Sequence, residues 1–518
     1  MKKKGIVYLV GAGPGDAGLI TVKGLNRLRE ADVVLHDNLA NSILLTECKS
    51  DCEKIFVGKE AGLHHVTQDK TTELLINKAK KGKKVVRLKG GDPLIFGRGS
   101  EEAIALQKAG IDFEIIPGVT AASGASAYAG IPLTHRNLVA QTVFVTAHEQ
   151  SDKTAPKVDW HSLAKMKNTT LVIYMGVSQI QSVTEKLITA GMSENTSASV
   201  IENATLNSQR TFVTTIKELS KTVESNNVKP PAIFIIGPTG DSYKQMGWFE
   251  NKPLHGKRIV CTRAEDQSQS LFNLLNEKGT VVVPFSTIKT KLSIPKMKIK
   301  TLFLKHKFDW IVFSSENGVR YFYELLRNEI LDSRLLSGIK VAAIGSGTGK
   351  KLNEHGIQPD FVPKNFTSES LVKELSKKVN LKGKNILRVK GNFLNDPLTE
   401  GLSSCGAKVT TYEVYKTFKA KPDKHTIKDL LNKKADAVLF TSMSTVTNFF
   451  DILGNNKSLA LLNNSITLAI GPVTAEELNR RGVKKVCISK VHTIDGMVEE
   501  LVRIITYSKD KHKLVFKD

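Results

Sequence analysis

The chain has 518 residues, 41% of them hydrophobic and 24% charged, as is typical of a globular protein with about three or four domains of roughly 150 residues each. No apolar run approaches the roughly 20 residues that a membrane-spanning helix needs. The net charge of +24 favours polyanionic ligands, either nucleic acid or small polycarboxylates, although many of the lysines are expected to lie on an ordinary solvated surface.

The five cysteines are odd in number and scattered along the chain. This usage predicts a reducing compartment, which we take to be the cytoplasm, and argues against a disulfide framework. Cys48 and Cys52 are too isolated for a zinc site, so no metal is expected.

A glycine-rich loop follows the first expected strand. Residues 6–10 form a buried-strand pattern, residues 11–16 (Gly-Ala-Gly-Pro-Gly-Asp) a loop and residues 21–31 a helix, which is the layout of a nucleotide-binding turn. The spacing Gly-x-Gly-x-Gly, with Pro14 inside it, differs from the dinucleotide-binding pattern, and the sequence contains no P-loop. The loop therefore favours a nucleoside-like ligand over a triphosphate.

Residues 87–99 (Arg-Leu-Lys-Gly-Gly-Asp-Pro-Leu-Ile-Phe-Gly-Arg-Gly) form a second loop of this kind. Gly90 and Gly91 allow a backbone to approach a ligand closely, and Asp92 places a carboxylate at the turn. A third loop, residues 117–121, follows the strand expected at residues 113–116. Strands and helices alternate throughout, which predicts a parallel α/β domain with its ligand beyond the carboxyl ends of the strands.

Six segments in this order strongly resemble the uroporphyrinogen-III C-methyltransferases of the tetrapyrrole methylase superfamily, over about residues 4–250. They are residues 10–16, 33–37, 87–99, 117–121, 127–136 and 174–176. The resemblance implies an N-terminal α/β domain (1–136), a C-terminal α/β domain (137–245), a linker (246–255) and S-adenosylmethionine (SAM) as methyl donor in the cleft between the domains. The implied SAM contacts are Pro14, Gly90, Gly91, Asp92, Ile95, Thr120, Ala121, Met175 and Ala204.

The implied reaction is transfer of two methyl groups to ring carbons of uroporphyrinogen III, giving precorrin-2. Asp37 matches the position of the proposed proton acceptor in this family, and Lys59 matches the position of the proposed proton donor. The alternative is that both residues only orient substrate carboxylates and pyrrole NH groups. Arg98, His135 and Arg136 are further candidates for binding substrate carboxylates.

Three positions depart from the family pattern. His36 stands where tyrosine is usual, Ala204 stands where glycine is common, and residues 231–240 end differently from the usual motif. The first two concern the fine geometry of the site, and the third is expected at the edge of the fold.

The second half contains an internal repeat. Residues 256–262 align with 383–389, and residues 309–315 align with 436–442, so that the copies start 127 residues apart (383 − 256 = 127). Each copy has serine- and threonine-rich turns where strands are expected to end. Such turns can bind anions at helix N-termini, or can simply cap those helices; we expect both roles.

Short motifs in this half resemble uroporphyrinogen-III synthase. They are residues 260–264, 313–319, 343–348, 415–417 and 470–475. The resemblance implies two α/β lobes, the first from 256–286 and 418–509 and the second, inserted, from 287–417. It implies closure of hydroxymethylbilane with loss of water and inversion of one ring. Tyr415 matches a family tyrosine that assists hydroxyl departure, although it could equally be a packing aromatic; candidates for carboxylate contact are Thr262, Arg263, Ser314, Ser315, Thr441, Ser442 and Thr474.

The sequence therefore predicts a bifunctional enzyme that makes uroporphyrinogen III and methylates it twice, towards siroheme or cobalamin. Its expected partners are tetrapyrrole substrates, with no nucleic acid and no membrane, and the family suggests a homodimer through the methyltransferase half. No dehydrogenase or chelatase motif is present, so those steps are expected in another protein. The alternatives are another superfamily member, acting on precorrins or on ribosomal RNA, and a non-catalytic SAM-binding regulator.

Overall fold

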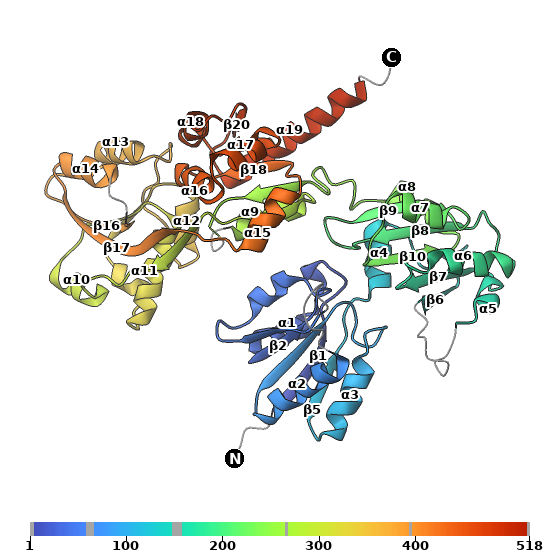
Figure 1. The fold of residues 1–518 in the computed structure, drawn as a ribbon. Helices are drawn as coiled ribbons and strands as arrows, with labels where there is room; N and C mark the ends of the chain where they lie inside the picture. The colour runs from blue at the N-terminus through green and yellow to red at the C-terminus, as the bar shows by residue number, and fades with distance from the viewer. Residues whose placement is uncertain (1–4, 59–66, 148–157, 265–267, 393–395, 515–518) are drawn as a thin grey trace. The chain divides into compact units, whose positions relative to one another are not determined.

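The computed structural model describes residues 5–58, 67–147, 158–264, 268–392 and 396–514, and these form four five-stranded sheets with flanking helices (Figure 1). The α/β class predicted from the sequence is confirmed. Within the described ranges, every helix is too short or too polar to cross a membrane.

The first sheet is parallel throughout and has the order β3-β2-β4-β1-β5. Strands β1 and β2 are nearly continuous apolar runs, because helices cover both faces of a parallel sheet. The carboxyl ends of the central strands β4 and β1 lead into the glycine loops. The elements are β1 (Ile6–Gly11), α1 (Val22–Glu30), β2 (Val33–His36), β3 (Glu53–Phe56), α2 (Gln68–Lys80), β4 (Lys84–Lys89), α3 (Gly99–Lys108), β5 (Asp112–Ile116) and α4 (Ala121–Ala129), with 3-10 turns at Ala17–Leu19 and Ser42–Glu47.

The second sheet is mixed and has the order β6-β7-β10-β8-β9. Strand β7 runs parallel to β6, whereas β10 is antiparallel to both β7 and β8. Apolar side chains on one face pack against α6 and α7, and this core includes the fully buried Phe234. The elements are β6 (Gln141–Thr146), α5 (Trp160–Ala164), β7 (Thr169–Tyr174), α6 (Ile180–Thr189), β8 (Ser197–Glu202), β9 (Arg210–Thr215), α7 (Leu219–Ser225), β10 (Ala232–Ile236) and α8 (Tyr243–Met246).

The segment after the second sheet is packed against the rest of this half. The ring of Phe249 lies against Tyr128 of α4, and both Phe249 and Leu254 are buried. The indole of Trp248 donates a hydrogen bond to the carbonyl of Ala127 at 2.9 Å. The region that the sequence predicts as a linker is therefore ordered by contacts of its own.

The third sheet has the order β12-β11-β18-β19-β20, and its pairs from β11 to β20 are parallel. Strand β11 pairs with β18, which lies far along the chain. The elements are β11 (Arg258–Cys261), α9 (Gln269–Glu277), β12 (Val281–Pro284), α15 (Lys424–Asn432), β18 (Ala437–Phe440), α16 (Met443–Leu453), α17 (Asn455–Asn463), β19 (Ile466–Ala469), α18 (Pro472–Arg480), β20 (Val486–Ile488) and α19 (Ile494–Leu514).

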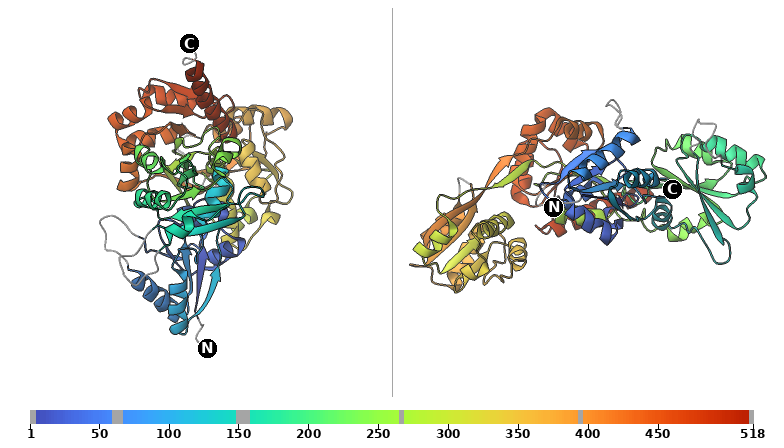
Figure 2. Two further views of the ribbon diagram at one scale, coloured as in Figure 1. Left: turned by 90° about the vertical axis from the view of Figure 1, so that its right-hand side faces the viewer. Right: turned by 90° about the horizontal axis from the view of Figure 1, so that it is seen from below.

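The fourth sheet, with the order β13-β17-β16-β14-β15, is formed by the chain between β12 and α15. Its long strand β17 runs parallel to β16 and then continues past it to pair antiparallel with β13 (Figures 1 and 2). The elements are β13 (Ile288–Leu292), α10 (Ile299–Lys305), β14 (Trp310–Phe313), α11 (Glu316–Asn328), β15 (Lys340–Ala343), α12 (Ser346–Asn353), α13 (Ser368–Lys378), β16 (Asn385–Gly391), α14 (Pro397–Ser404) and β17 (Lys408–Lys419), with a 3-10 turn at Ser333–Leu336.

The two copies of the sequence repeat contribute to both of these sheets. The first copy supplies β11, β12, β14 and β15, and the second supplies their counterparts β16, β17, β18 and β19. The order of strands is β12-β11-β18-β19 in the third sheet and β17-β16-β14-β15 in the fourth, which is the same order of counterparts. Each sheet therefore combines the first half of one copy with the second half of the other.

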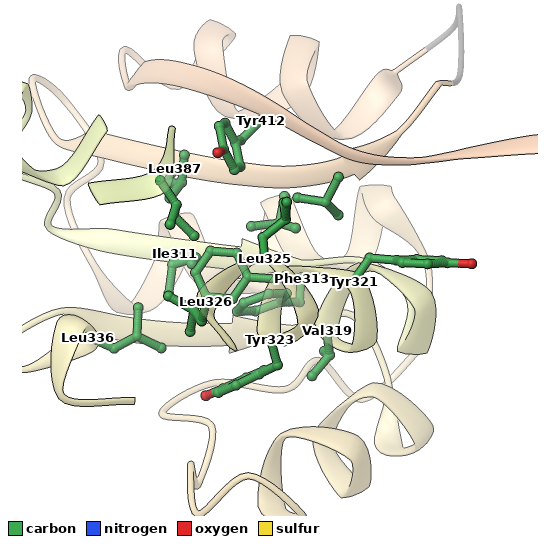
Figure 3. Packing of buried hydrophobic residues seen from close by; sticks show 14 of the residues in the cluster. Ile311, Phe313, Val319, Tyr321, Tyr323, Leu325, Leu326, Leu336, Leu387 and Tyr412 are labelled. Carbon is green, nitrogen blue, oxygen red and sulfur yellow. The ribbon is translucent and has the colours of Figure 1, made fainter. Parts of the chain in front are cut away.

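Helix α11 anchors the core of the fourth sheet. Its apolar face packs on β14 and β16, and Figure 3 shows Val319, Leu325 and Leu326 of the helix gathered around Ile311 and Phe313. Tyr323 of the same helix stacks on His355, with ring centroids 3.8 Å apart and 7° between the ring planes.

His355 should make the free energy of unfolding of this region depend on pH, because its pKa is lowered in the folded chain. Burial, followed by the positive charges of Lys351 and Arg327, lowers that pKa below its ordinary value of 6.5. As the pH falls through about 6.5, the unfolded chain takes up the proton before the folded chain does. We expect the free energy of unfolding of this region to fall from about pH 6.5 towards the lowered pKa and to level off below it.

This expectation can be measured by urea unfolding at about pH 7.5 and about pH 5. Replacing Trp160 and Trp248 by phenylalanine leaves Trp310 on β14 as the sole tryptophan reporter. The midpoint should fall at the lower pH in this background and should fall less in the variant His355→Phe, which retains an aromatic ring. Equal shifts in the two proteins would contradict the assignment.

Candidate functional site

Three loops meet at the carboxyl ends of β1, β4 and β5, where their backbones are in direct contact. The amide of Gly91 donates to the carbonyl of Gly13 at 2.7 Å, and the amide of Gly13 donates to the carbonyl of Gly91 at 3.3 Å. A Cβ atom on Gly118 would lie only 2.3 Å from the Gly91 oxygen. The approach therefore requires glycine at position 118, and Gly91 itself has a φ of +69°.

The carboxylate of Asp92 bridges two of these loops by hydrogen bonds. Its Oδ1 accepts a hydrogen bond from the amide of Leu94 at 2.8 Å, and its Oδ2 accepts one from the amide of Gly118 at 3.0 Å. A carboxylate is needed at this position because it bridges amides on two different loops. Each carboxylate oxygen has a further lone pair that can accept from a ligand.

Tyr174, at the end of β7, brings residues of the second sheet to these loops. Its hydroxyl lies 2.7 Å from the hydroxyl of Thr120 and accepts from the amide of Ala122 at 2.9 Å. Its ring also contacts Phe96. Burial raises the pKa of Tyr174, so its hydroxyl stays protonated at neutral pH. Sequence reasoning did not assign this tyrosine, although it directly precedes Met175.

A second contact joins the first glycine loop to the second sheet. The amide of Asp16 donates to the hydroxyl of Thr205 at 2.9 Å, next to the predicted contact residue Ala204. The carboxylate of Asp16 accepts from Tyr128 at 2.6 Å. Burial and this hydrogen bond hold the pKa of Tyr128 well above its usual range.

The predicted SAM-binding residues lie on these loops and just after the ends of β7 and β8. Ile95 and Met175 expose apolar side chains, and 51% of Met175 is accessible. SAM carries a flat aromatic adenine and no phosphate, and an exposed thioether and close-packed glycine backbones suit such a ligand better than a cluster of cations does. The residues present therefore fit SAM. Pro14, Gly90, Thr120 and Ala121 are partly exposed, whereas Ala204 is buried.

Asp37 is the first residue after β2 and forms an ion pair with Arg87 of β4. Its Oδ2 accepts from Nη2 of Arg87 at 3.0 Å, and its Oδ1 accepts from the amide of Leu39 at 3.0 Å. Both oxygens are thus held in place while 23% of the side chain remains accessible. Burial lowers the pKa of the adjacent His36, which favours the neutral ring. The other predicted catalytic residue of this half, Lys59, lies outside the described residues.

The three predicted carboxylate-binding residues of this half are all exposed. Arg98 has a left-handed backbone, with a φ of 59°, and its guanidinium pairs with Glu101 at 2.6 Å. His135 and Arg136 lie in the turn before β6, where His135 bridges to Val139. The structure therefore gives Arg98 a local partner and leaves its predicted role as an expectation.

In the second half, Tyr415 and Ser315 come together from β17 and the N-terminus of α11. Their hydroxyl oxygens are 3.2 Å apart, and Tyr415 also stacks on Tyr321. Ser315 caps α11 by accepting from the amide of Gly318 at 3.0 Å. Burial raises the pKa of Tyr415, so its hydroxyl remains a proton donor at neutral pH.

The remaining predicted residues of this half lie where strands of the third and fourth sheets end. Ser442 caps α16 in a capping box, Ser314 and Thr441 directly follow β14 and β18, and Thr474 is buried in the first turn of α18. Thr262 is also buried, and its hydroxyl donates to the carbonyl of Leu439 at 2.8 Å. Arg263 forms an ion pair with Glu316 at 3.4 Å.

Two charged residues near Asp37 were not assigned from the sequence. Arg87 opens the second glycine loop and was noted only as part of that motif, and Glu102 was not noted at all. The sequence does carry a signal for them. Arg87 and Lys89 alternate with apolar residues in the buried part of β4, which implies a buried partner of opposite charge. Among the residues that the structure describes, no group of three or more His, Cys, Asp or Glu side chains could hold a metal ion.

Family models match both halves of the chain. Residues 6–220 match the model of tetrapyrrole (corrin/porphyrin) methylases, and residues 252–499 match the model of uroporphyrinogen-III synthase HemD. The two matches follow one another along the chain in the order that the sequence motifs predict.

Characterised relatives match in the same way. The porphyrin biosynthesis protein HemD of Ruminiclostridium josui is 34% identical over 96% of this chain and 98% of its own length. The uroporphyrinogen-III C-methyltransferase of Bacillus subtilis (strain 168) is 38% identical over 69% of this chain and 74% of its own. A solved uroporphyrin-III C-methyltransferase from Thermus thermophilus aligns with 45% of this chain and 98% of its own at 36% identity, with a TM-score of 0.39.

The fold and these matches define an enzyme of tetrapyrrole biosynthesis with two activities, and the sequence-based prediction of this class is confirmed. One activity is that of a SAM-dependent methyltransferase, and the other is that of a uroporphyrinogen-III synthase. More particularly, the chain belongs to the family in which a tetrapyrrole methylase is joined to a uroporphyrinogen-III synthase in one polypeptide.

Proposed function

We propose that this chain closes hydroxymethylbilane to uroporphyrinogen III, with loss of water and inversion of ring D, and then methylates that product twice to give precorrin-2. Precorrin-2 would feed siroheme or cobalamin biosynthesis. The observation that carries the proposal is the presence of both family domains on one chain, matched over 98% of the length of a porphyrin biosynthesis protein. One half thereby makes the substrate of the other.

The four sheets support the assignment of each activity to its own half of the chain. We assign the methyltransferase to residues 1–136 and 137–245, which contain the first and second sheets. Residues 246–255 connect the halves. The synthase then comprises a first lobe from 256–286 with 418–509 and a second lobe from 287–417.

At the methyltransferase site, SAM would supply an electrophilic methyl group. The residues proposed to hold it are Pro14, Gly90, Gly91, Asp92, Ile95, Thr120, Ala121, Met175 and Ala204. A pyrrole carbon is a weak nucleophile, so these loops contribute mainly by positioning. After the new carbon–carbon bond forms, the ring must lose a proton, and Asp37 is proposed to accept it, with Lys59 as donor. Arg98, His135 and Arg136 are proposed to bind substrate carboxylates.

At the synthase site, Tyr415 is proposed to donate a hydrogen bond to the departing hydroxyl group of hydroxymethylbilane. Its protonated state and its contact with Ser315 support this role. The eight carboxylates of the substrate would be bound by helix N-termini and their hydroxyls. The residues proposed for these contacts are Thr262, Arg263, Ser314, Ser315, Thr441, Ser442 and Thr474.

The test is to incubate the purified protein with hydroxymethylbilane under anaerobic conditions, with and without SAM. We expect uroporphyrinogen III without SAM and a doubly methylated product with it, followed by absorbance and mass. Formation of uroporphyrinogen I alone, the product of spontaneous closure, would exclude the synthase activity. The methyltransferase would then be tested separately on supplied uroporphyrinogen III.

Replacing Tyr415 by phenylalanine is expected to lower the synthase rate about 10-fold, because the departing hydroxyl loses one hydrogen bond of about 1–1.5 kcal/mol. The measurement is the initial rate of uroporphyrinogen III formation. Tyr412→Phe is the matched control, since Tyr412 lies on the same strand and donates to the carbonyl of Met297 at 2.9 Å. Equal rates for the two variants would show that Tyr415 contributes only to packing and not to the reaction.

We further propose that the protein acts in the cytoplasm as a homodimer formed through its methyltransferase half, with a separate dehydrogenase and chelatase downstream. The odd number and scattered positions of the five cysteines support a reducing compartment. Sedimentation of the whole protein and of a chain ending after the methyltransferase would test the dimer, and a monomer in both would exclude it.

A further inference from the structure

A cluster of buried charges lies directly behind Asp37. Arg87 and Lys89 project from β4, and Glu102 projects from α3. Their side chains are 8%, 5% and 0% accessible, respectively. Charges so deeply buried cost free energy unless each is paired, and apolar residues of similar volume often stabilise a core as well or better. Fold stability alone therefore gives no reason for this cluster.

Glu102 is the centre of the cluster. Its Oε1 accepts from Nε2 of Gln68 at 2.8 Å and from Nε of Arg87 at 3.4 Å. Its Oε2 accepts from Nζ of Lys89 at 3.0 Å. Burial, and then the neighbouring Arg87, lowers the pKa of Lys89, while Glu102 acts in the opposite direction. The Glu102 carboxylate thus fixes two cations that would otherwise repel each other.

Arg87 connects this centre to the site. Its Nε faces Glu102, its Nη1 donates to the carbonyl of Leu88 at 2.9 Å, and its Nη2 donates to Oδ2 of Asp37 at 3.0 Å. The guanidinium is rigid and planar, so the contact at Nε determines where Nη2 points. Glu102 consequently determines the position of the group that holds one oxygen of Asp37.

We propose that Glu102 is a positioning residue for methyl transfer, which acts through Arg87 to hold the Asp37 carboxylate in the orientation that accepts the substrate proton. This inference rests on the role proposed above for Asp37. Lys89 and Gln68 serve Glu102 by saturating its two oxygens. A misplacement of about 1 Å at such a group costs a rate on the order of 100-fold, which sets the scale of the expected effect.

The test is a double-mutant cycle between Glu102→Gln and Asp37→Asn in the full chain, with uroporphyrinogen III and SAM as substrates. Glu102→Gln should lower kcat about 10- to 100-fold while KM and the Kd for SAM stay within about 2-fold. In the Asp37→Asn background the same substitution should change kcat by less than about 2-fold, because the group it positions is gone. Glu114→Gln is the matched control, since Glu114 lies on β5 of the same sheet, pairs with Arg27 of α1 and should leave kcat unchanged.

Each other outcome counts against a specific statement. If the two substitutions lowered kcat independently, so that the double variant showed the product of the two single losses, Glu102 would be purely structural and the inference would be overturned. A SAM affinity that weakened in step with kcat would lead to the same conclusion. An active Glu102→Gln beside an inactive Asp37→Asn would also overturn it while leaving the proposed function intact. A fully active Asp37→Asn would instead overturn the proposed role of Asp37. Should Glu102→Gln fail to fold, Arg87→Lys supplies the same test, because lysine has a single terminal nitrogen and cannot reproduce the fork that contacts Glu102 and Asp37 together.

Discussion

Replacing Asp37 by asparagine is expected to lower the rate of methyl transfer about 1,000-fold while SAM binding and the synthase activity remain intact. An amide has nearly the same shape and its oxygen can still accept from Arg87 or from the amide of Leu39, but it cannot take up the proton that leaves the substrate ring. General bases contribute roughly 100- to 10,000-fold to a rate, which gives the expected size. The measurement is single-turnover methylation of supplied uroporphyrinogen III under anaerobic conditions.

Asp32→Asn is the matched control for this substitution. Asp32 immediately precedes β2, the same strand that Asp37 follows, and accepts from the amide of Lys84 at 2.9 Å. It lies at the opposite end of the strand from the glycine loops, so its removal should change the rate by less than about 3-fold. If Asp37→Asn kept more than about a tenth of the rate, Asp37 would only orient the substrate, which is the alternative that the sequence leaves open.

Replacing Gly118 by alanine is expected to weaken SAM binding about 10- to 100-fold. The added methyl group would lie 2.3 Å from the oxygen of Gly91 and 2.8 Å from Cα of Gly11, so the three loops could not keep their present separation. Backbone atoms, unlike the end of a long side chain, cannot move away cheaply. The Kd for SAM, measured by titration calorimetry, reports the effect directly.

Gly110→Ala separates this effect from a general loss of stability. Gly110 lies in the turn after α3 with a φ of +68°, so alanine is strained there, but no atom lies within 4 Å of the added carbon. SAM affinity should stay within about 2-fold for this control. An unchanged affinity for Gly118→Ala would show that the close approach of the loops is not needed for binding.

The sequence predicts features that depend on local chemistry. Glycine at positions 11, 13 and 91, together with the strand and helix patterns around them, identifies the loops because only glycine permits such a close approach. Ser315 and Ser442 follow the same logic, since a hydroxyl after a strand and before a helix indicates a cap. Local rules of this kind place residues on elements but do not say which elements meet.

Long-range pairing could not be predicted from the residues alone. The repeat indicates two copies of one unit but not which strands pair. An inserted second lobe was implied only by the family resemblance, and the strand order is what shows the exchange of halves between the third and fourth sheets. Glu102 and Tyr174 were missed for the same reason, because each acquires its role through a partner on a distant element, Arg87 and Thr120 respectively. The roles assigned to Asp37, Lys59 and Tyr415 remain predictions.

The exchange of halves has a consequence for synthesis on the ribosome. Strand β11 is made early, but its partner β18 begins only at Ala437, which is 176 residues after Cys261 (437 − 261 = 176). At roughly 5–20 residues per second, the side of β11 that pairs with β18 waits on the order of ten seconds or more for that partner. The fourth sheet is complete by Lys419 and can close in that interval. The nascent chain therefore completes the fourth sheet before the third, and the period in between is when β11 is most exposed to chaperones and to aggregation.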